Sequence, residues 1–350
     1  MKLLLATDAW HPQTNGVVRT LGTMVEALHA DGHTVEVVSP ADYPTVPLPS
    51  YPEIRLAVWL RGLSARIEAF DPDCIHVSTE GPIGQWVRRL CLKRGYAFTT
   101  SFHTRFPEYL RERLPIPLAI SYPPIRRFHR PAARTLVPTQ TLKDDLLARG
   151  FEHLEVWGRG VDTALFSPER AEPFDLPRPI HLNVGRVAPE KNLHAFLDLD
   201  LPGSKLVVGD GPQLEELKRR YPQVVFVGAK FGEELATCYA SADVFVFPSR
   251  TDTFGLVMLE AIASGTPVAA YPVTGPLDVV DQGINGVMDE DLGQAIGQAL
   301  ALDRSRCRES ALPRSWDVIA RQFRRALVPV TLDKVDAVEQ AQCDSPALGC

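Results

Sequence analysis

Residues 180–211 read IHLNVGRVAPEKNLHAFLDLDLPGSKLVVGDG. Two short apolar runs, IHLNV and KLVV, are each followed by a glycine, and the stretch between them has a helical pattern. Apolar strands that alternate with helices are typical of a parallel sheet covered by helices on both faces. This stretch therefore predicts a doubly wound α/β domain.

The same alternation occurs twice along the chain. The first half has apolar runs that predict strands at 2–6, 35–39, 74–78, 97–103 and 135–139. The pattern restarts near residue 160, with runs at 180–186, 205–211, 224–228, 244–249 and 267–273. The proline-rich residues 166–179 are typical of a linker. We therefore predict two doubly wound domains, with ligands beyond the carboxyl ends of the strands and a cleft between the domains.

Composition excludes several classes of protein. The 350 residues suit two domains, and the net charge of −6 is not that of a nucleic-acid-binding protein. No apolar run approaches 18 residues, and Asp8 directly follows the first one, which favours a strand over a signal peptide. The six cysteines lack CxxC or zinc-ligand spacing, which indicates a reduced cytosolic protein.

Two acids stand eight positions apart in SRTDTFGLVMLEA, residues 249–261. Asp252 falls in a predicted turn, and Glu260 falls among apolar residues of a predicted helix that begins near Gly255. A buried carboxylate needs a partner, from the protein or from a ligand. The two acids are either an acid/base pair or fixed acceptors for a hydroxyl-rich ligand, and Asp252 as a helix cap with Glu260 paired internally is a third reading.

Several other residues follow predicted strands. Arg186 and Lys191 come after the run 180–184, where two cations near a helix start suit a diphosphate, although a solvated surface pair is equally compatible. Gly209 belongs to a Gly-Asp-Gly turn, and Gly16 lies at a helix start where backbone can approach an anion. Both glycines also fit plain turns or caps. His103 is the last residue of the run 97–103, just past the expected strand, and a single histidine is more often structural.

Taken together, these segments resemble glycosyltransferase family 4, the retaining, sugar-nucleotide-dependent transferases of GT-B fold. The matching stretches span residues 2–328 and are TDAWHPQTNGVVRTL, SFHTRFPEY, GRGVDTALFSP, NVGRVAPEKN, VVGDGP, ADVFVFPSRTDTFGLVMLEAIASGTPVAA and SWDVIARQF. The resemblance implies two Rossmann-like domains facing a central cleft. It also implies front-face transfer with retention. No DxD-type metal site stands out in the sequence, so we expect neither an obligatory metal nor another cofactor.

The resemblance assigns roles to the acids and cations. Arg186 and Lys191 would hold the donor diphosphate, Glu260 would bind the ribose, and Asp252 would contact hydroxyls of the donor sugar. Asp252 departs from the family pattern, in which this position is usually Glu, so the identity of the sugar stays open.

The remaining site residues are also implied by the resemblance. His103 would lie near the transferred sugar on the acceptor side. The donor would meet backbone or close-approach positions at Gly16, Gly209, Phe254, Gly255 and Leu256.

Local charge favours a membrane acceptor. Residues 81–135 hold eleven Lys or Arg and two Glu, a local net charge of +9, interleaved with apolar and aromatic residues. Basic side chains near an anionic leaflet contribute about 1 kcal/mol each. We therefore predict that residues 84–134 contact the inner face of the plasma membrane, although an ordinary solvated face has the same composition. The motif variant resembles bacterial lipid-directed members of the family, namely glycosyl-diacylglycerol synthases and phosphatidylinositol mannosyltransferases.

The preferred function is hexosyl transfer from UDP-glucose or UDP-glucuronate to a lipid such as diacylglycerol. A GDP-mannose-dependent mannosyltransferase acting on a phosphatidylinositol, a polysaccharide or a small acceptor is the alternative, and a scaffold with a decayed site is a weaker one. The predicted domains are an acceptor-binding domain (1–163), a nucleotide-sugar-binding domain (164–312), a helix crossing back to the first domain (313–330) and a disordered tail (331–350).

Overall fold

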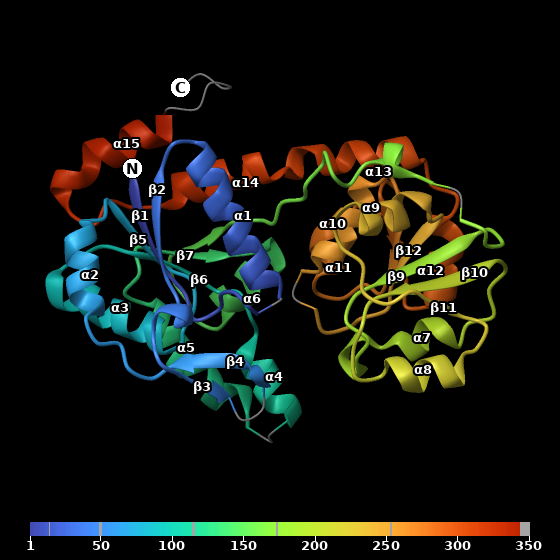
Figure 1. Cartoon of the computed structure of the whole chain (residues 1–350), viewed down its shortest axis with the longest axis horizontal. Coiled ribbons are helices and arrows are strands. Elements are labelled where there is room, and N and C mark those ends of the chain that lie inside the picture. Colours follow the sequence, from blue (N-terminus) through green and yellow to red (C-terminus); the bar gives the residue numbers. More distant parts are fainter. Residues whose placement is uncertain (14, 49–50, 114–115, 173, 253, 344–350) are drawn as a thin grey trace. The chain divides into compact units, whose positions relative to one another are not determined.

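The computed structural model describes residues 1–343 except 14, 49–50, 114–115, 173 and 253 (Figure 1). The chain divides into two units. The first unit is Met1–Arg159 together with the segment from Trp316 onward, and the second unit is Gly160–Ser315. The chain therefore leaves the first unit once and returns to it once.

The first unit contains a six-stranded parallel sheet in the order β2-β1-β5-β6-β7-β8. Its strands are β1 (Lys2–Ala6), β2 (Thr34–Val38), β5 (Cys74–Val77), β6 (Thr99–Ser101), β7 (Arg134–Val137) and β8 (Leu154–Val156). A separate antiparallel hairpin, which the apolar pattern did not predict, consists of β3 (Thr45–Leu48) and β4 (Tyr51–Ala57).

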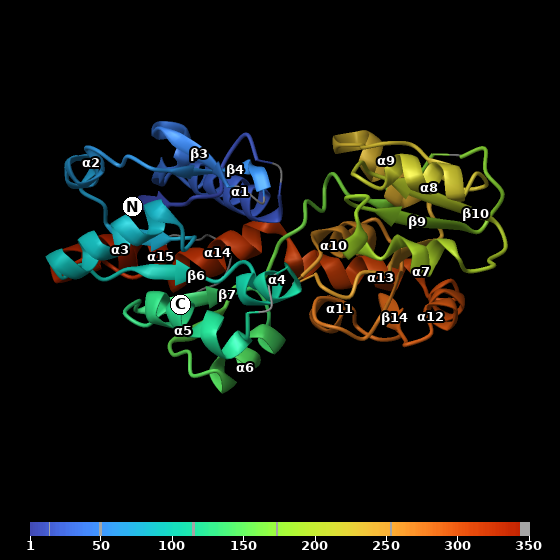
Figure 2. The same cartoon turned by 90° about the horizontal axis from the view of Figure 1, so that it is seen from below.

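Helices cover both faces of this sheet. Side chains alternate across a strand, so Leu3 and Leu5 pack on one face and Leu4 and Ala6 on the other. The first face is covered by α1 (Gly16–Ala30), α14 (Trp316–Ala326) and α15 (Val335–Cys343), and the second by α2 (Leu63–Phe70), α3 (Pro82–Arg94) and α5 (Leu118–His129) (Figure 2). The remaining helices of this unit are α4 (Phe106–Arg113) and α6 (Gln140–Ala148).

The second unit repeats this architecture with the strand order β11-β10-β9-β12-β13-β14. Its parallel strands are β9 (Ile180–Val184), β10 (Ser204–Val208), β11 (Val225–Phe226), β12 (Val244–Phe247), β13 (Val268–Ala270) and β14 (Gly286–Met288). One face carries α9 (Gly232–Ser241), α10 (Leu256–Ala263) and α13 (Arg304–Ala311), and the other α7 (Leu193–Leu197), α8 (Leu214–Arg220) and α12 (Leu292–Ala299) (Figure 1). The short helix α11 is Pro276–Val279, and single 3₁₀ turns are η1 (Pro40–Asp42), η2 (Pro168–Arg170), η3 (Pro189–Lys191), η4 (Leu312–Arg314) and η5 (Leu332–Lys334).

In each sheet there is one point at which the order of strand addition reverses. In the second unit the chain runs outward from β9 through β10 to β11, and then from β12 through β13 to β14 on the other side. In the first unit the corresponding point lies between β1 and β5. Ligands of doubly wound sheets bind beyond the carboxyl ends of the strands at such switch points. The prediction of two doubly wound parallel-sheet domains is confirmed.

Two expectations, one about the linker and one about the C-terminal tail, are wrong. Residues 166–179 are not a linker but part of the second unit, because Phe166 is buried in its core against the ring of Tyr239. The crossings between the units lie at Arg159–Gly160 and Ser315–Trp316, close to the predicted 163/164 and 312/313. The tail predicted to be disordered from 331 forms η5 and α15, because Val338 and Ala341 bury an apolar stripe. Residues 344–350 lie outside the described part of the chain.

Candidate active site

Lys191 and Asp252 meet at the switch point of the second unit. Lys191 ends η3 after β9, and Asp252 lies in the turn between β12 and α10. The Lys191 Nζ donates to Asp252 Oδ1 at 2.6 Å, which forms an ion pair between two partly exposed side chains. Sixty-one positions of sequence separate these residues, so adjacency of β9 and β12 brings them together.

Further hydrogen bonds join the same two loops. The Asn192 side chain, on a residue with φ of +54°, donates to the Pro248 carbonyl at 3.0 Å. The hydroxyls of Ser249 and Thr251 both donate to the Glu190 carbonyl. The loop that carries Lys191 is therefore fastened to the loop that carries Asp252. Asn192 was missed from the sequence, although an Asn directly after a Pro-Glu-Lys turn suits the left-handed conformation.

Asp252 keeps one carboxylate oxygen available for a ligand. Its Oδ2 is buried and has no hydrogen-bond partner among the residues that the structure describes. A Cβ at Gly275 would lie 2.9 Å from the Asp252 carbonyl, so the loop after β13 packs directly against this turn.

Arg186 is exposed, and the described part of the chain offers it neither an ion pair nor a hydrogen bond through its side chain.

The turn after Asp252 leads into α10. Gly255 has φ of +80° and precedes the first helical residue, Leu256, while Phe254 is buried in the core. A Cβ on Gly255 would lie 2.9 Å from the Met258 side chain, so both the backbone angle and the packing favour glycine here. Helix α10 spans Leu256–Ala263, close to the predicted Gly255–Ser264.

Glu260 has a protein partner. It is 2% exposed on α10, and the Tyr239 hydroxyl of α9 donates to its Oε2 at 2.8 Å. The internally paired reading of Glu260 is therefore present, and a ribose contact remains a prediction. Tyr239 was missed because nothing in its local sequence marks it.

Gly209 has a clear structural reason to be glycine. Its φ is +148°, and a Cβ there would lie 1.8 Å from the Gly185 carbonyl oxygen. The loops after β9 and β10 thus pack backbone against backbone. The Val187 N–H donates to the carbonyl of Asp210 in the Gly-Asp-Gly turn, and the Val187 carbonyl accepts from the N–H of Gln213 just beyond it. This contact positions the segment that bears Arg186, whatever further contact Gly209 makes with a donor.

The two remaining predicted residues belong to the first unit. Gly16 is exposed and begins α1, where the Asn15 side chain caps the backbone N–H groups of Val17 and Val18. His103 follows β6 and is buried, and its Nδ1 lies 3.0 Å from Nη2 of Arg159. Asn15 and Arg159 were not among the predicted site residues. The predicted set therefore divides between the second unit, where Lys191 and Asp252 are in contact, and the first unit, which holds Gly16 and His103.

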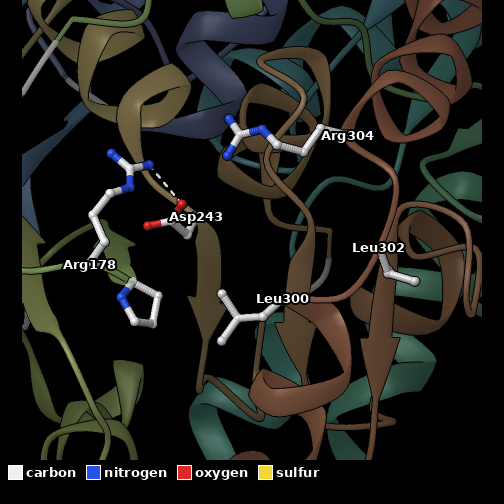
Figure 3. Close-up of a pocket in the computed structure, with 6 residues that line it drawn as sticks. Arg178, Asp243, Leu300, Leu302 and Arg304 are labelled. Carbon is white, nitrogen blue, oxygen red and sulfur yellow. Dashed lines mark hydrogen bonds and ion pairs between the residues drawn. The ribbon is translucent and has the colours of Figure 1, made fainter.

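A separate pocket lies at the opposite edge of the second sheet. Its volume is about 480 Å³, and Arg178, Asp243 and Arg304 line it near the amino ends of β9 and β12 (Figure 3). Arg178 donates to Asp243 at 2.7 Å, and Arg304 donates to the Ala240 carbonyl at 2.8 Å. These charged groups are occupied by protein partners, and this edge is not the ligand edge of a parallel sheet.

Within the described ranges there is no group of three or more His, Cys, Asp or Glu side chains that could hold a metal ion. Among the helices that the structure describes, none is both long enough and apolar enough to cross a bilayer.

Comparison with known proteins identifies the family to which the chain belongs. Residues 14–165 match the family model described as Glycosyltransferase Family 4, and residues 178–302 match the model described as Glycosyl transferases group 1. A GDP-mannose-dependent alpha-mannosyltransferase of Mycobacterium tuberculosis is 30% identical over 92% of this chain and 95% of its own length. An alpha-monoglucosyldiacylglycerol synthase of Streptococcus pneumoniae is 27% identical over 96% of this chain and 86% of its own length.

Solved structures share the fold. Anabaena Alr3699/HepE, in complex with UDP-glucose, superimposes with a TM-score of 0.68 at 17% identity, covering 93% of this chain and 98% of that one. The GT-B fold that the sequence motifs implied is therefore confirmed. With a full-length relative at this level of identity and family models matching both units, the chain belongs to glycosyltransferase family 4.

Proposed function

We propose that the chain transfers a hexosyl unit from UDP-glucose or UDP-glucuronate to a membrane lipid such as diacylglycerol, giving an α-glycolipid. The part of the proposal that concerns the sugar donor rests on the Lys191–Asp252 pair at the switch point, where one oxygen of Asp252 is left for a ligand. The part that concerns the acceptor rests on the exposed side chains of α3 and α5 and on the lipid synthase among the relatives.

The geometry suits departure of a nucleoside diphosphate. Negative charge grows on the diphosphate as the bond to the sugar breaks. Lys191 and the exposed Arg186 supply positive charge beside the switch point. Asp252 Oδ2 can accept a hydrogen bond from a sugar hydroxyl. In this proposal the charge of these side chains replaces a metal ion, and transfer occurs with retention on the face from which the diphosphate leaves.

The exposed basic side chains of α3 and α5 support a membrane acceptor. Arg88 on α3 donates to the carbonyls of Phe128 and Arg127, which joins α3 to the end of α5. The side chains exposed along these two helices and the residues after them include Trp86, Arg89, Leu92, Lys93, Ile120, Arg126, Arg127 and Arg130. Cations with interleaved apolar side chains fit an anionic leaflet, and we place this surface against the cytoplasmic side of the membrane.

Not every cation of residues 84–134 faces the lipid. Arg94 pairs with Glu68, and Arg105 pairs with Asp145 and Glu108, so these side chains contribute less to a membrane contact. Leu114 and the side chains of Tyr109 and Arg113, which belong to the predicted surface, lie outside the described part of the structure.

A second candidate has specific support. The relative from Mycobacterium tuberculosis carries the name of a GDP-mannose-dependent alpha-mannosyltransferase and aligns over nearly its whole length. GDP-mannose as donor, with a phosphatidylinositol, a polysaccharide or a small soluble acceptor, is therefore the alternative.

One panel separates the two candidates. Thermal unfolding is followed with UDP-glucose, UDP-glucuronate and GDP-mannose, where a ligand at 100 times its Kd stabilises the fold by about 2.7 kcal/mol. Transfer from the stabilising donor is then measured with liposomes that contain diacylglycerol. Stabilisation by a UDP-sugar and a new glycolipid support the proposal, whereas stabilisation by GDP-mannose alone supports the alternative.

Flotation independently tests the part of the proposal that concerns the acceptor. The chain should float with anionic liposomes at low salt, and the double variant Arg89→Glu/Lys93→Glu should float less. A chain that stays at the bottom of the gradient at low salt removes the physical support for a lipid acceptor.

A further inference from the structure

Arg159 is a buried cation in direct contact with His103. It is 7% exposed, and its Nη1 donates to the carbonyls of Trp157 and Gly158, each at 3.0 Å. Its Nη2 lies 3.0 Å from Nδ1 of His103. In the part of the chain that the structure describes, Arg159 forms no ion pair with a carboxylate. Burying an unpaired charge is costly, so the position of Arg159 calls for an explanation beyond packing.

The contact fixes the protonation state of His103. A guanidinium has only donors, so the Nδ1 that faces it must accept through a lone pair. The proton of the neutral imidazole is then on Nε2. Burial, followed by the positive charge of Arg159 and by His76 and His129, holds the pKa of His103 well below its usual range. His103 is therefore a neutral Nε2–H tautomer at neutral pH.

The opposite nitrogen lacks a protein partner. Nε2 of His103 is buried and makes no hydrogen bond to any residue that the structure describes. A buried N–H group left without a partner costs about 1–3 kcal/mol. This group follows the carboxyl end of β6, the edge of the sheet where ligands bind. An oxygen of a bound ligand would satisfy it.

The C-terminal segment holds Arg159 in place through Trp157. The Arg159 guanidinium lies 4.9 Å from the centroid of the Trp157 ring, which in turn packs 4.8 Å from the ring of Phe323 on α14. The Trp157 indole N–H donates to the Ile319 carbonyl on the same helix at 3.3 Å. The ring of His103 also packs edge-on against Trp157. Helix α14, on which the chain returns to the first unit, therefore holds Trp157 against Arg159 and His103.

We propose that Arg159 is a positioning residue for the transfer reaction: it holds His103 as the Nε2–H tautomer, so that His103 donates a hydrogen bond to a hydroxyl oxygen of the transferred sugar. His103 does not accept the proton of the acceptor hydroxyl. The proposal deepens the proposed function and rests on it for the identity of the ligand.

The tautomer is measured directly in the wild-type protein. Histidine labelled with ¹⁵N and a long-range proton–nitrogen correlation distinguish the two tautomers and the imidazolium, and the His103 signals are those missing in His103→Gln. We expect the neutral Nε2–H form at pH 7. An Nδ1–H form or an imidazolium at that pH overturns the proposal without any need for transfer activity.

Variants of Arg159 separate positioning from folding. Arg159→Met removes the donor, and we expect a mixed tautomer population and a kcat lower by about 10²-fold, as for a misplaced catalytic contact, with donor KM close to that of wild type. Arg159→Lys keeps a group with only donors and should restore the Nε2–H form and most of kcat. Arg149→Met is the matched control, because Arg149 also lies over an aromatic ring, that of Tyr122, at 4.3 Å. An unchanged tautomer in Arg159→Met, or equal losses in the Met and Lys variants, overturns the proposal.

Variants of His103 separate donation from base catalysis. His103→Gln retains an N–H donor and should keep more kcat than His103→Leu, whereas a general base would be lost equally in both. If no nucleotide sugar supports transfer, the proposed function fails while the tautomer measurement still stands. If transfer occurs but His103 is the Nδ1–H form, the inference about Arg159 fails alone.

Discussion

The side-chain nitrogen of Lys191 lies 2.6 Å from a carboxylate oxygen of Asp252, and this ion pair joins the loops that follow β9 and β12. Both side chains are partly exposed, at 28% and 20%, so each can also reach a ligand. The pair places a cation for a diphosphate beside an acceptor for a sugar hydroxyl. Each group also orients the other.

Lys191→Ala should lower kcat strongly. Removing one stabilising group from a developing anion typically costs about 10²–10³ in kcat, and the variant also leaves Asp252 without its partner. The measurement is steady-state transfer from the donor that stabilises the wild type, with circular dichroism to verify the fold.

The matched control for this variant is Lys218→Ala. Lys218 also pairs with a carboxylate, that of Glu215, but the pair is on the surface of α8. Transfer should stay close to wild type in this control. Near-normal turnover of a folded Lys191→Ala protein would contradict the role assigned to Lys191.

Asp252→Glu should change the ranking of donor sugars. The longer arm moves the carboxylate by about one C–C bond, so hydroxyl contacts made by Oδ2 must shift while the ion pair to Lys191 can re-form. Relative kcat/KM for UDP-glucose, UDP-glucuronate and GDP-mannose is the measurement. Asp252→Asn, which keeps the length and loses the charge, reports the contribution of the ion pair. An unchanged ranking in Asp252→Glu shows that this residue does not select the sugar.

Tyr239→Phe should destabilise the second unit. The hydroxyl is the donor to Glu260, and a buried carboxylate that loses a hydrogen bond typically costs about 1–3 kcal/mol. Denaturant unfolding measures the change in the free energy of unfolding.

Tyr221→Phe is the control for Tyr239→Phe. The Tyr221 hydroxyl also donates to a carboxylate, Asp198, but that acid is 57% exposed. Water can replace the lost donor there, so the loss of stability should be smaller. Equal losses in the two variants would mean that burial of Glu260 does not set the cost.

Stability should fall at acid pH through His76. This side chain is fully buried between Thr99 and Ser101, and burial lowers its pKa to about 3. Between about pH 6.5 and about 3 the unfolded chain binds a proton here and the folded chain does not, so stability is present above this window and is lost as pH falls through it. The slope is about 1.4 kcal/mol per pH unit for this one group.

Replacing His76 by Gln should make the pH dependence shallower by this amount, whatever the variant does to stability at neutral pH. The measurement is denaturant unfolding at pH 7, 6 and 5, and His29→Gln, at an exposed position of α1, is the control. The same slope in His76→Gln and wild type would contradict the assignment.

Much of the fold was predictable because its strands are short, continuous apolar runs buried on both faces. The runs predicted at 180–186 and 244–249 became β9 and β12, each of which ends two residues earlier than predicted. The hairpin of β3 and β4 was not predicted, and Phe166 and Val338 were assigned to a linker and a tail. Phe166 and Val338 are held by apolar contacts with residues far away in the sequence, and a local sequence pattern carries no information about such contacts.

The candidate site also has features that local sequence predicts and contacts that it does not predict. Local sequence was enough to predict that Arg186, Lys191, Asp252 and Glu260 follow strands of a doubly wound sheet, because glycine turns, charge and apolar periodicity are local properties. The contacts of Lys191 with Asp252, of Tyr239 with Glu260 and of Arg159 with His103 became visible only in the folded chain. Each of these contacts joins side chains from elements that become neighbours only when the sheets and their covering helices assemble, so long-range packing sets their geometry.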